Sequence, residues 1–273
     1  MKRTTLTLIL AGIIFTLIIP ISQAGEKQIV VQGSTTVLPI AQAAAEVFMQ
    51  NNPQADLSIR GGGSGNGIAS LIDGTCDIAD SSRPMKDKEI LLCQEKGVSP
   101  VPHIIAMDGI AVIVHPSNLI QGLTTEQIKD IYIGKITNWK ELGGEDQKIV
   151  VVSRDSSSGT YEIFETIVLQ GKKVTPESLS QTSNQTVATI ISTTKGAIGY
   201  VGLGYISSNV KALQVNEVIP EKAMVINGTY PISRSLFMYT NGAPQGITID
   251  FIKFIWSQEG QKIVEEQGFI PLP

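Results

Sequence analysis

The sequence predicts an α/β fold with parallel strands, on three observations. Short apolar segments typical of buried strands recur along the chain, each ends in a turn rich in Gly, Ser or Thr, and each turn leads into a segment with helical apolar spacing. Three such strands are Gln28–Gly33, Leu57–Ile59 and Asp77–Ala79, and Ile149–Val152 is a fourth. The length of 273 residues allows one large domain or two lobes.

The N-terminus has the features of a secretory signal peptide. Lys2 and Arg3 precede an apolar run, Leu6–Ile19, and small residues stand three positions and one position before a cleavage point after Ala24. The alternative is an uncleaved membrane anchor, but the run is short for a span of about 20 residues. We therefore expect a signal peptide over residues 1–24 and a periplasmic location.

The composition of the remaining chain excludes several classes of protein. Cleavage after Ala24 leaves 249 residues with 19 basic and 25 acidic side chains, a net charge of −6. This excludes a nucleic-acid binder held by bulk charge, a membrane transporter and a disordered tail protein. Cys76 and Cys93 are the two cysteines. A disulfide and buried free thiols both remain open, but two cysteines cannot form a four-ligand zinc site.

The other elements follow from the same patterns. Val37–Gln50 has helical apolar spacing, and Pro39 lies in its opening turn, where a missing N–H costs little. A helix starts at Thr124, because Gln127 three residues later completes a capping box. Ile104–Val114 is a long apolar extended run. The other predicted helices are Ile68–Ile72, a charged helix ending at Lys96-Gly97, Tyr161–Leu169, Pro244–Gln258 and Glu259–Gln267, and the other predicted strands are Gly196–Gly202 and Tyr230–Tyr239.

Four turns rich in Ser, Thr and Gly stand where helices are predicted to begin: Ser34–Thr36, Gly61–Gly67, Asp80–Pro84 and Arg154–Thr160. The start of a helix leaves about four backbone N–H groups without partners and carries a partial positive charge. Small hydroxyl residues add O–H donors there, and glycines let an anion approach the backbone. Helix capping explains any one of these turns, but four together favour a site for a small oxyanion.

Arg154 supports this interpretation. Only four arginines follow Ala24, against 15 lysines, and Arg154 stands at the end of a buried strand and opens a hydroxyl-rich turn. α/β folds place their ligands at the carboxyl ends of strands, and a guanidinium can donate two parallel hydrogen bonds to one oxyanion. The alternative is a surface ion pair with Asp155 or another carboxylate.

Enzyme signatures are weak. The glycine-rich turn misses the G-x-S-x-G elbow and the G-x-G-x-x-G fingerprint at Asn66, and the sequence has no P-loop. The only histidines are His103 and His115, and the acidic residues form no tight cluster for a metal. We expect no catalytic residue, metal or cofactor. A secreted phosphoester hydrolase using Ser64 or Ser158 is kept as an alternative.

Four motifs resemble those of a known family. They are Gly33-Ser34-Thr35-Thr36, Gly63-Ser64-Gly65, Asp77-Ile78-Ala79-Asp80-Ser81-Ser82 and Arg154-Asp155-Ser156-Ser157-Ser158-Gly159-Thr160. In order and spacing they are similar to the periplasmic phosphate-binding proteins of the phosphate-specific ABC transporter, the PstS-like family. The Arg-x-x-x-Ser-Gly-Thr turn is the most specific of them, and the resemblance extends over nearly all of the chain after Ala24.

The resemblance implies a two-lobed periplasmic-binding-protein fold. Each lobe is expected to be a mixed, mostly parallel sheet flanked by helices, and Ile104–Val114 and Tyr230–Tyr239 are expected to be two hinge strands that cross between the lobes. Residues 25–106 and 231–273 would form one lobe and residues 107–230 the other, with a ligand cleft between them. By position in the motifs, the implied ligand-binding residues are Ser34, Thr35, Thr36, Ser64, Gly65, Ser82, Arg154, Ser158, Gly159 and Thr160.

One position departs from the family. In much of it the third turn carries an Asp that accepts the proton of hydrogen phosphate, a proton that sulfate lacks. Here Ser82 occupies that position and Asp80 lies two residues earlier. Because a serine hydroxyl can either accept or donate, receptors for sulfate, molybdate or another tetrahedral oxyanion remain alternatives.

The function that the resemblance implies is capture of inorganic phosphate by an exported solute-binding protein. The expected partners are phosphate and the membrane permease of an ABC transporter, to which the bound anion is delivered. We expect a monomer that binds no nucleic acid.

Overall fold

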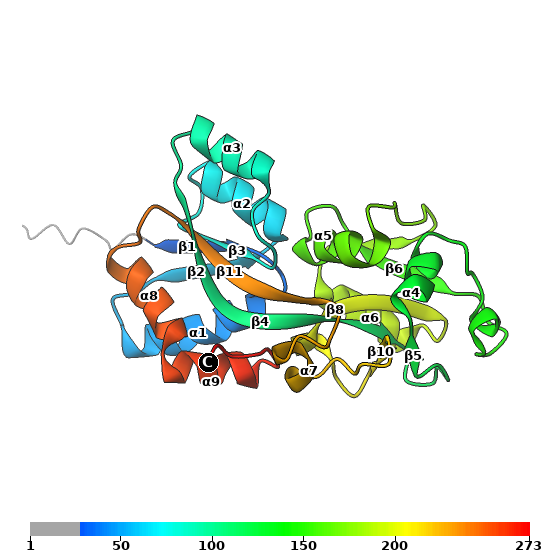
Figure 1. Ribbon diagram of the computed structural model, residues 1–273. Helices are drawn as coiled ribbons and strands as arrows, with labels where there is room; N and C mark the ends of the chain where they lie inside the picture. Colours follow the sequence, from blue (N-terminus) through cyan, green and yellow to red (C-terminus); the bar gives the residue numbers. More distant parts are fainter. Residues whose placement is uncertain (1–27) are drawn as a thin grey trace, which may run out of the picture.

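The structure, a computed structural model, describes residues 28–273, so the signal peptide predicted over residues 1–24 lies outside the described part. Figure 1 shows two lobes side by side, joined by two long strands, β4 (Pro100–Val114) and β11 (Ser233–Asn241). Among the described residues, no helix has the length and apolar character needed to cross a membrane.

The first lobe contains the beginning and the end of the described chain. Its other elements are β1 (Ile29–Gly33), α1 (Leu38–Asn51), β2 (Leu57–Gly61), α2 (Ser64–Ile72), β3 (Ile78–Ser81), α3 (Asp87–Glu95), α8 (Gly246–Trp256) and α9 (Gln258–Glu266). The second lobe contains β5 (Gly122–Leu123), α4 (Thr125–Tyr132), β6 (Val150–Arg154), α5 (Gly159–Phe164), β7 (Leu179–Gln181), α6 (Asn184–Thr193), β8 (Ala197–Gly202), β9 (Lys211–Ala212), β10 (Gln214–Val215) and α7 (Lys222–Ile226). Two short 3-10 helices, Trp139–Leu142 and Leu203–Tyr205, and a π-helical turn, Glu165–Leu169, complete it.

One curled sheet runs through both lobes in the order β2-β1-β3-β11-β4-β8-β6-β7, with β9 beside β4. β1 pairs in parallel with β2 and β3, and β6 pairs in parallel with β7 and β8. The two crossing strands are antiparallel to each other and to their neighbours β3 and β8. Since ligands of such sheets bind beyond the carboxyl ends of the strands, the ends of β1, β3 and β6 mark the place of a site.

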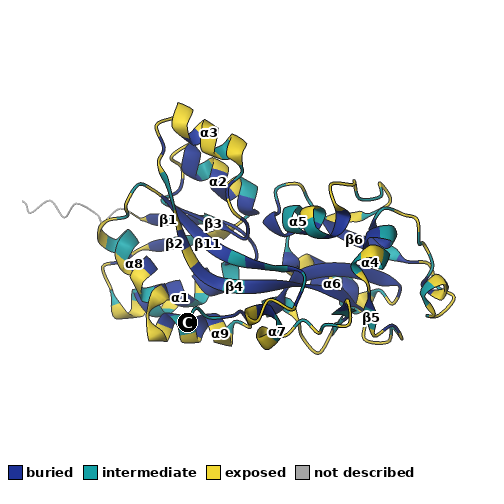
Figure 2. Cartoon of the chain, in the orientation of Figure 1, coloured by how far each residue is buried: buried dark blue, intermediate teal, exposed yellow. Residues whose placement is uncertain are grey.

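Each lobe has its own apolar core, and Figure 2 shows buried strands beneath helices whose outer faces are exposed. In the first lobe Val31 and Ile78, opposite each other on β1 and β3, pack against α1 through residues such as Phe48. The core of the second lobe includes Phe164 and Tyr200, whose rings stack with centroids 4.0 Å apart. Both cores hold the strand ends and helix starts in fixed positions.

The predicted α/β fold with two crossing strands is confirmed, but several boundaries are wrong; for example, the second crossing strand spans Ser233–Asn241 rather than Tyr230–Tyr239. α2 begins at Ser64 rather than Ile68, because its glycines allow it to lie against β1: a Cβ at Gly67 would be 2.5 Å from the carbonyl oxygen of Gln32. The helix predicted over Tyr161–Leu169 begins at Gly159 and changes to a π-helical turn at Glu165. The first crossing strand begins at Pro100, four residues before its apolar run.

The two cysteines are free thiols buried in the first lobe. Burial, with smaller contributions from Asp80 and Asp77, raises the pKa of Cys76 to about 12. The thiol is therefore protonated at neutral pH and a weak nucleophile. Of the two alternatives that the sequence leaves open, the structure contains buried free thiols.

Candidate anion-binding site

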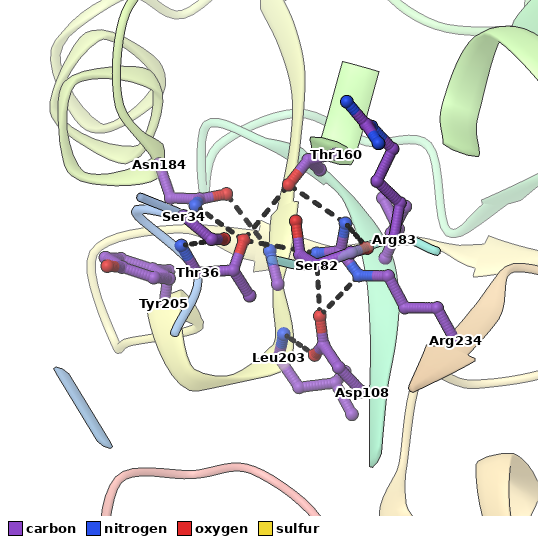
Figure 3. Close-up of polar contacts among 12 residues, drawn as sticks. Ser34, Thr36, Ser82, Arg83, Asp108, Thr160, Asn184, Leu203, Tyr205 and Arg234 are labelled. Carbon is purple, nitrogen blue, oxygen red and sulfur yellow. Dashed lines mark hydrogen bonds and ion pairs between the residues drawn. The ribbon is translucent and has the colours of Figure 1, made fainter. Parts of the chain in front are cut away.

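Hydroxyl groups from both lobes meet between the lobes. Thr35 and Thr36 lie between β1 and α1, Ser64 opens α2, and Thr160 lies in the first turn of α5. The Oγ1 atoms of Thr36 and Thr160 are 3.0 Å apart (Figure 3). The structure brings together the turns that the sequence singles out, and all of their predicted site residues except the half-buried Gly65 are buried: Ser34, Thr35, Thr36, Ser64, Ser82, Arg154, Ser158, Gly159 and Thr160.

Two glycines allow the lobes to touch at this point. A Cβ at Gly159 would lie 2.4 Å from Ser64 Oγ and 2.7 Å from Ser82 Oγ, so a side chain there would separate the lobes. The N–H of Gly65 donates to the carbonyl of Ser157 in the second lobe, at 2.9 Å. Ser158, the residue before Gly159, caps α5 by accepting a hydrogen bond from Tyr161 N at 3.2 Å.

Ser82 lies in the site, but not at the start of a helix as predicted. Its turn does not open a helix, because Pro84 disfavours helical backbone before it and α3 begins only at Asp87. Instead, the N–H of Ser82 donates to Ser64 Oγ at 3.0 Å, and the two hydroxyl oxygens are 3.3 Å apart. Asp80 is buried with no hydrogen-bond partner for either carboxylate oxygen, and burial raises its pKa well above the ordinary value.

Arg154 is 4% exposed, which excludes the surface ion pair considered as an alternative. Its Nε donates to the carbonyl of Gln181 at 3.1 Å, and its Nη2 donates to the carbonyl of Thr182 at 3.0 Å and to Thr35 Oγ1 at 3.2 Å. Its Nη1 is buried and has no hydrogen-bond partner. Burial lowers the pKa of Arg154, but a guanidinium stays protonated in proteins. The site thus contains a fixed positive charge with two N–H groups to offer.

A second buried arginine, Arg234, is missing from the site residues predicted from the sequence. Arg234 on β11 lies directly opposite Asp108 on β4, and its Nη2 and Nε lie 2.8 and 3.0 Å from Asp108 Oδ2. Arg234 also donates to Thr160 Oγ1 at 3.0 Å and to Thr36 Oγ1 at 3.3 Å (Figure 3). Burial raises the pKa of Asp108, against the opposing attraction of Arg234. A charged residue within each of two apolar extended runs is the signal that could have identified the pair.

Asn184 is another residue that the sequence prediction misses. It is fully buried at the first position of α6, and its Nδ2 donates to Thr35 Oγ1 at 3.1 Å and to Thr36 Oγ1 at 3.0 Å. Its Oδ1 accepts a hydrogen bond from Gly202 N at 3.3 Å. Ser183 before it caps the helix by accepting from Thr186 N, and this cap preceding an apolar segment is the missed signal.

Ion pairs tie the lobes together beside the hydroxyl groups. Arg83 in the first lobe is 3% exposed, and its Nε lies 2.5 Å from Glu162 on α5 of the second lobe. Lys86 Nζ lies 2.7 Å from the same Glu162 oxygen. The Nη2 and Nη1 groups of Arg83 donate hydrogen bonds to the carboxylate oxygens of Glu89, at 2.7 and 2.8 Å. Burial favours a higher pKa for Glu89, but hydrogen bonds from Arg83 and Lys86 outweigh it and lower the pKa below its ordinary value.

The histidines lie apart from this cluster. His103 Nε2 is 2.9 Å from Thr240 Oγ1, and the exposed His115 is 2.8 Å from Ser117 Oγ. Neither contacts Ser64 or Ser158 through a hydrogen bond, so neither is in place to activate those serines. In residues 28–273, no group of three or more His, Cys, Asp or Glu side chains could hold a metal ion.

Comparisons with known proteins agree with this geometry. Residues 20–259 match the family described as the PBP superfamily domain. The chain is 37% identical over 257 residues to the phosphate-binding protein PstS of Bacillus subtilis (strain 168), covering 92% of this chain and 84% of the relative.

Two solved structures are also similar. One is a Clostridium perfringens protein described as a phosphate ABC transporter substrate-binding protein, solved with bound phosphate, with a TM-score of 0.84, 37% identity, and 90% of this chain and 100% of that chain covered. The other is an ABC-type phosphate transport receptor from Vibrio cholerae, with a TM-score of 0.73, 34% identity and the same coverage. The chain therefore belongs to the PBP superfamily and, within it, to the PstS-like phosphate-binding proteins.

Proposed function

We propose that this protein binds inorganic phosphate between its lobes and delivers it to the permease of an ABC transporter, acting outside the cytoplasmic membrane as a receptor and not as an enzyme. The observation that carries the proposal is the buried guanidinium of Arg154, whose Nη1 has no partner and whose Nη2 bonds to Thr35 of the opposite lobe. The Bacillus, Clostridium and Vibrio relatives, which are described as phosphate-binding or phosphate-transport proteins, support it.

The proposed site binds its anion with donors from both lobes. Transferring a dianion out of water is costly unless donors and positive charges replace its hydration. Arg154 and Thr160 come from the second lobe, whereas Thr35, Ser64 and Ser82 come from the first. An anion that bonds to both sets has a higher affinity for the closed arrangement and drives hinge closure.

The hinge would divide the chain as its sequence implies. The proposed lobes are residues 25–106 with 231–273, and residues 107–230, with the hinge in β4 and β11. The three apolar clusters support this division, since one draws almost all its members from residues 110–232 and the other two draw theirs from the flanking segments.

Isothermal titration tests the proposal. Protein freed of ligand by unfolding and refolding should bind inorganic phosphate in a one-to-one complex with micromolar or tighter affinity, on the order of −8 kcal/mol or beyond. A flat titration of correctly refolded protein would exclude phosphate as the ligand. Steady turnover of a chromogenic phosphate ester, lost on replacement of Ser64 or Ser158, would instead support the hydrolase alternative.

The ion pairs between the lobes should hold the closed state. Glu162→Gln removes the carboxylate that lies 2.5 Å from Arg83 and 2.7 Å from Lys86. We expect phosphate to bind about five- to thirty-fold more weakly, equivalent to about 1–2 kcal/mol for partly buried pairs, mainly through faster dissociation. Stopped-flow measurement of phosphate release gives the rate directly.

Glu165→Gln is the matched control for this variant, because Glu165 lies three residues further along and pairs with the exposed Lys173 of its own lobe. It should release phosphate at the rate of the unchanged protein. Equal release rates for the two variants would show that the ion pairs of Glu162 do not stabilise closure.

Ser82→Asp should sharpen discrimination between phosphate and sulfate. Ser82 lies within 3.3 Å of Ser64 Oγ in the site, so a carboxylate there would face the bound anion. Hydrogen phosphate can donate its proton to that carboxylate, whereas sulfate meets it with lone pairs. We expect the ratio of phosphate to sulfate affinity to rise at least about tenfold, measured by competition titration.

Ser82→Ala separates this effect from simple loss of the hydroxyl. It removes one hydrogen bond from either anion and should weaken both by similar factors. If Ser82→Asp left the affinity ratio unchanged, residue 82 would not contact the anion.

A further inference from the structure

The hydrogen-bonding capacity of the hydroxyl groups restricts which way they can point. A hydroxyl has one proton to donate and two lone pairs that accept. Thr35 Oγ1 accepts from Arg154 Nη2 at 3.2 Å and from Asn184 Nδ2 at 3.1 Å. Both of its lone pairs are then used, so the proton is all that Thr35 has left to offer.

Thr36 and Thr160 are restricted in the same way. Thr36 Oγ1 accepts from Asn184 Nδ2 at 3.0 Å and from Arg234 Nη2 at 3.3 Å, so it must donate its own proton. Thr160 Oγ1, 3.0 Å away, can receive that proton, and it also accepts from Arg234 Nη1 at 3.0 Å. The lone pairs of Thr160 are then filled as well, and its proton is free for a ligand.

The amide of Asn184 cannot be turned round without loss. Its Oδ1 accepts a hydrogen bond from the backbone N–H of Gly202 at 3.3 Å, and a backbone N–H can only donate. The Nδ2 group must therefore face the two threonines, with one N–H for each. Asn184 is fully buried, so bulk water is not available as a substitute partner.

The N–H groups of the Arg234 side chain also all have hydrogen-bond partners. Its Nε and one N–H of Nη2 go to Asp108, and its remaining N–H groups reach Thr36, Thr160 and the carbonyl of Ser82, the last at 3.3 Å. Asp108 Oδ1 accepts from Leu203 N at 2.9 Å, so the carboxylate in this network also has its oxygens occupied. Asp108 therefore has no free oxygen that could accept a proton from the threonines.

We propose that Asn184, together with the two arginines, orients the hydroxyls of Thr35, Thr36 and Thr160 so that Thr35 and Thr160 present only protons to the bound anion, while Thr36 donates its proton to Thr160. Asn184 is thus a specificity-determining residue that favours oxyanions whose oxygens all accept. Ser82 is different, because its hydroxyl forms a hydrogen bond only with Ser64 Oγ among the described residues, at 3.3 Å. The filled threonines cannot accept the proton of hydrogen phosphate, whereas the hydroxyl of Ser82 has a lone pair left for it. This inference rests on the proposed binding of phosphate.

Asn184→Asp tests the inference with almost no change in shape. The new carboxylate can only accept, so Thr35 and Thr36 would turn their protons toward it and their lone pairs toward the ligand. Phosphate can turn a proton of its own toward those lone pairs, but sulfate has none. We expect sulfate affinity to fall at least about tenfold more than phosphate affinity, measured by calorimetry with both anions at one pH.

Asn184→Ala is the matched control. It removes the two N–H donors without adding an acceptor, so the hydroxyls can rotate and both anions should weaken by the same factor. Equal loss of both anions in Asn184→Asp would overturn the inference, because a merely structural role predicts that result. An unchanged protein that binds neither anion would refute the proposed function instead, so the two failures are distinguishable.

Thr35→Val keeps the inference testable if Asn184→Asp does not fold, which thermal unfolding would reveal. It removes a hydroxyl that the inference makes a donor for either anion. Phosphate and sulfate should therefore weaken by similar factors. A loss confined to phosphate would mean that Thr35 accepts the phosphate proton, and the inference would be wrong.

Discussion

Replacing Arg154 with alanine is expected to abolish measurable phosphate binding in a protein that still folds. The guanidinium offers two N–H groups at Nη1 and is fixed by the carbonyls of Gln181 and Thr182. Two charge-assisted hydrogen bonds of roughly 1.5–3 kcal/mol each correspond to a loss of at least about 150-fold in affinity. Isothermal titration with phosphate measures the loss, and circular dichroism with thermal unfolding verifies the fold.

Two further variants interpret the result. Arg154→Lys keeps the charge but replaces a planar fork with a single ammonium, so we expect weak binding between the two extremes. Arg60→Ala is the control, because Arg60 is an exposed arginine in the first lobe whose Nε bonds to Ser58. Normal phosphate binding by Arg154→Ala would remove this arginine from the site and with it the main support for the proposed function.

Features that depend only on residues close together in the chain were predictable from the sequence. The strand–turn–helix units predicted the parallel strands, and the hydroxyl-rich turns predicted which segments meet between the lobes. Arg154 belongs to this group, because the end of a buried strand and the turn after it stand side by side in the chain. Such local patterns reflect backbone geometry that depends little on distant residues.

Features that depend on distant pairing were not predictable in the same way. Arg234 and Asp108 are 126 residues apart and become partners only through the register of β4 with β11. Asn184 gains its role because α6 starts opposite the turn after β1. The third turn illustrates the converse error: the sequence predicts that a helix begins there, whereas α3 begins only at Asp87 and the N–H of Ser82 is satisfied by Ser64 of another element.

Removing the charge of Asp108 is expected to destabilise the whole fold. Asp108→Asn keeps the size of the side chain but leaves the guanidinium of Arg234, 2% exposed, without its counter-charge. Breaking one partner of a buried ion pair typically costs about 3–5 kcal/mol. For a chain of this length that lowers the midpoint of thermal unfolding by roughly 6–20 °C. The matched control is Asp73→Asn, which breaks the exposed pair of Asp73 with Lys96 and should cost less than about 1 kcal/mol.

The double variant Asp108→Asn/Arg234→Met distinguishes stability from function. Once the arginine is gone no unpaired charge remains, so we expect the double variant to be more stable than Asp108→Asn alone, and a double-mutant cycle should show strong coupling. Its phosphate affinity should nevertheless stay low, because Thr36 and Thr160 have lost the donor that orients them. Additive stabilities would contradict this account. If the double variant regains stability but not phosphate binding, the ion pair is needed for the anion site and not for holding the hinge strands together. An apolar pair could hold those strands together equally well.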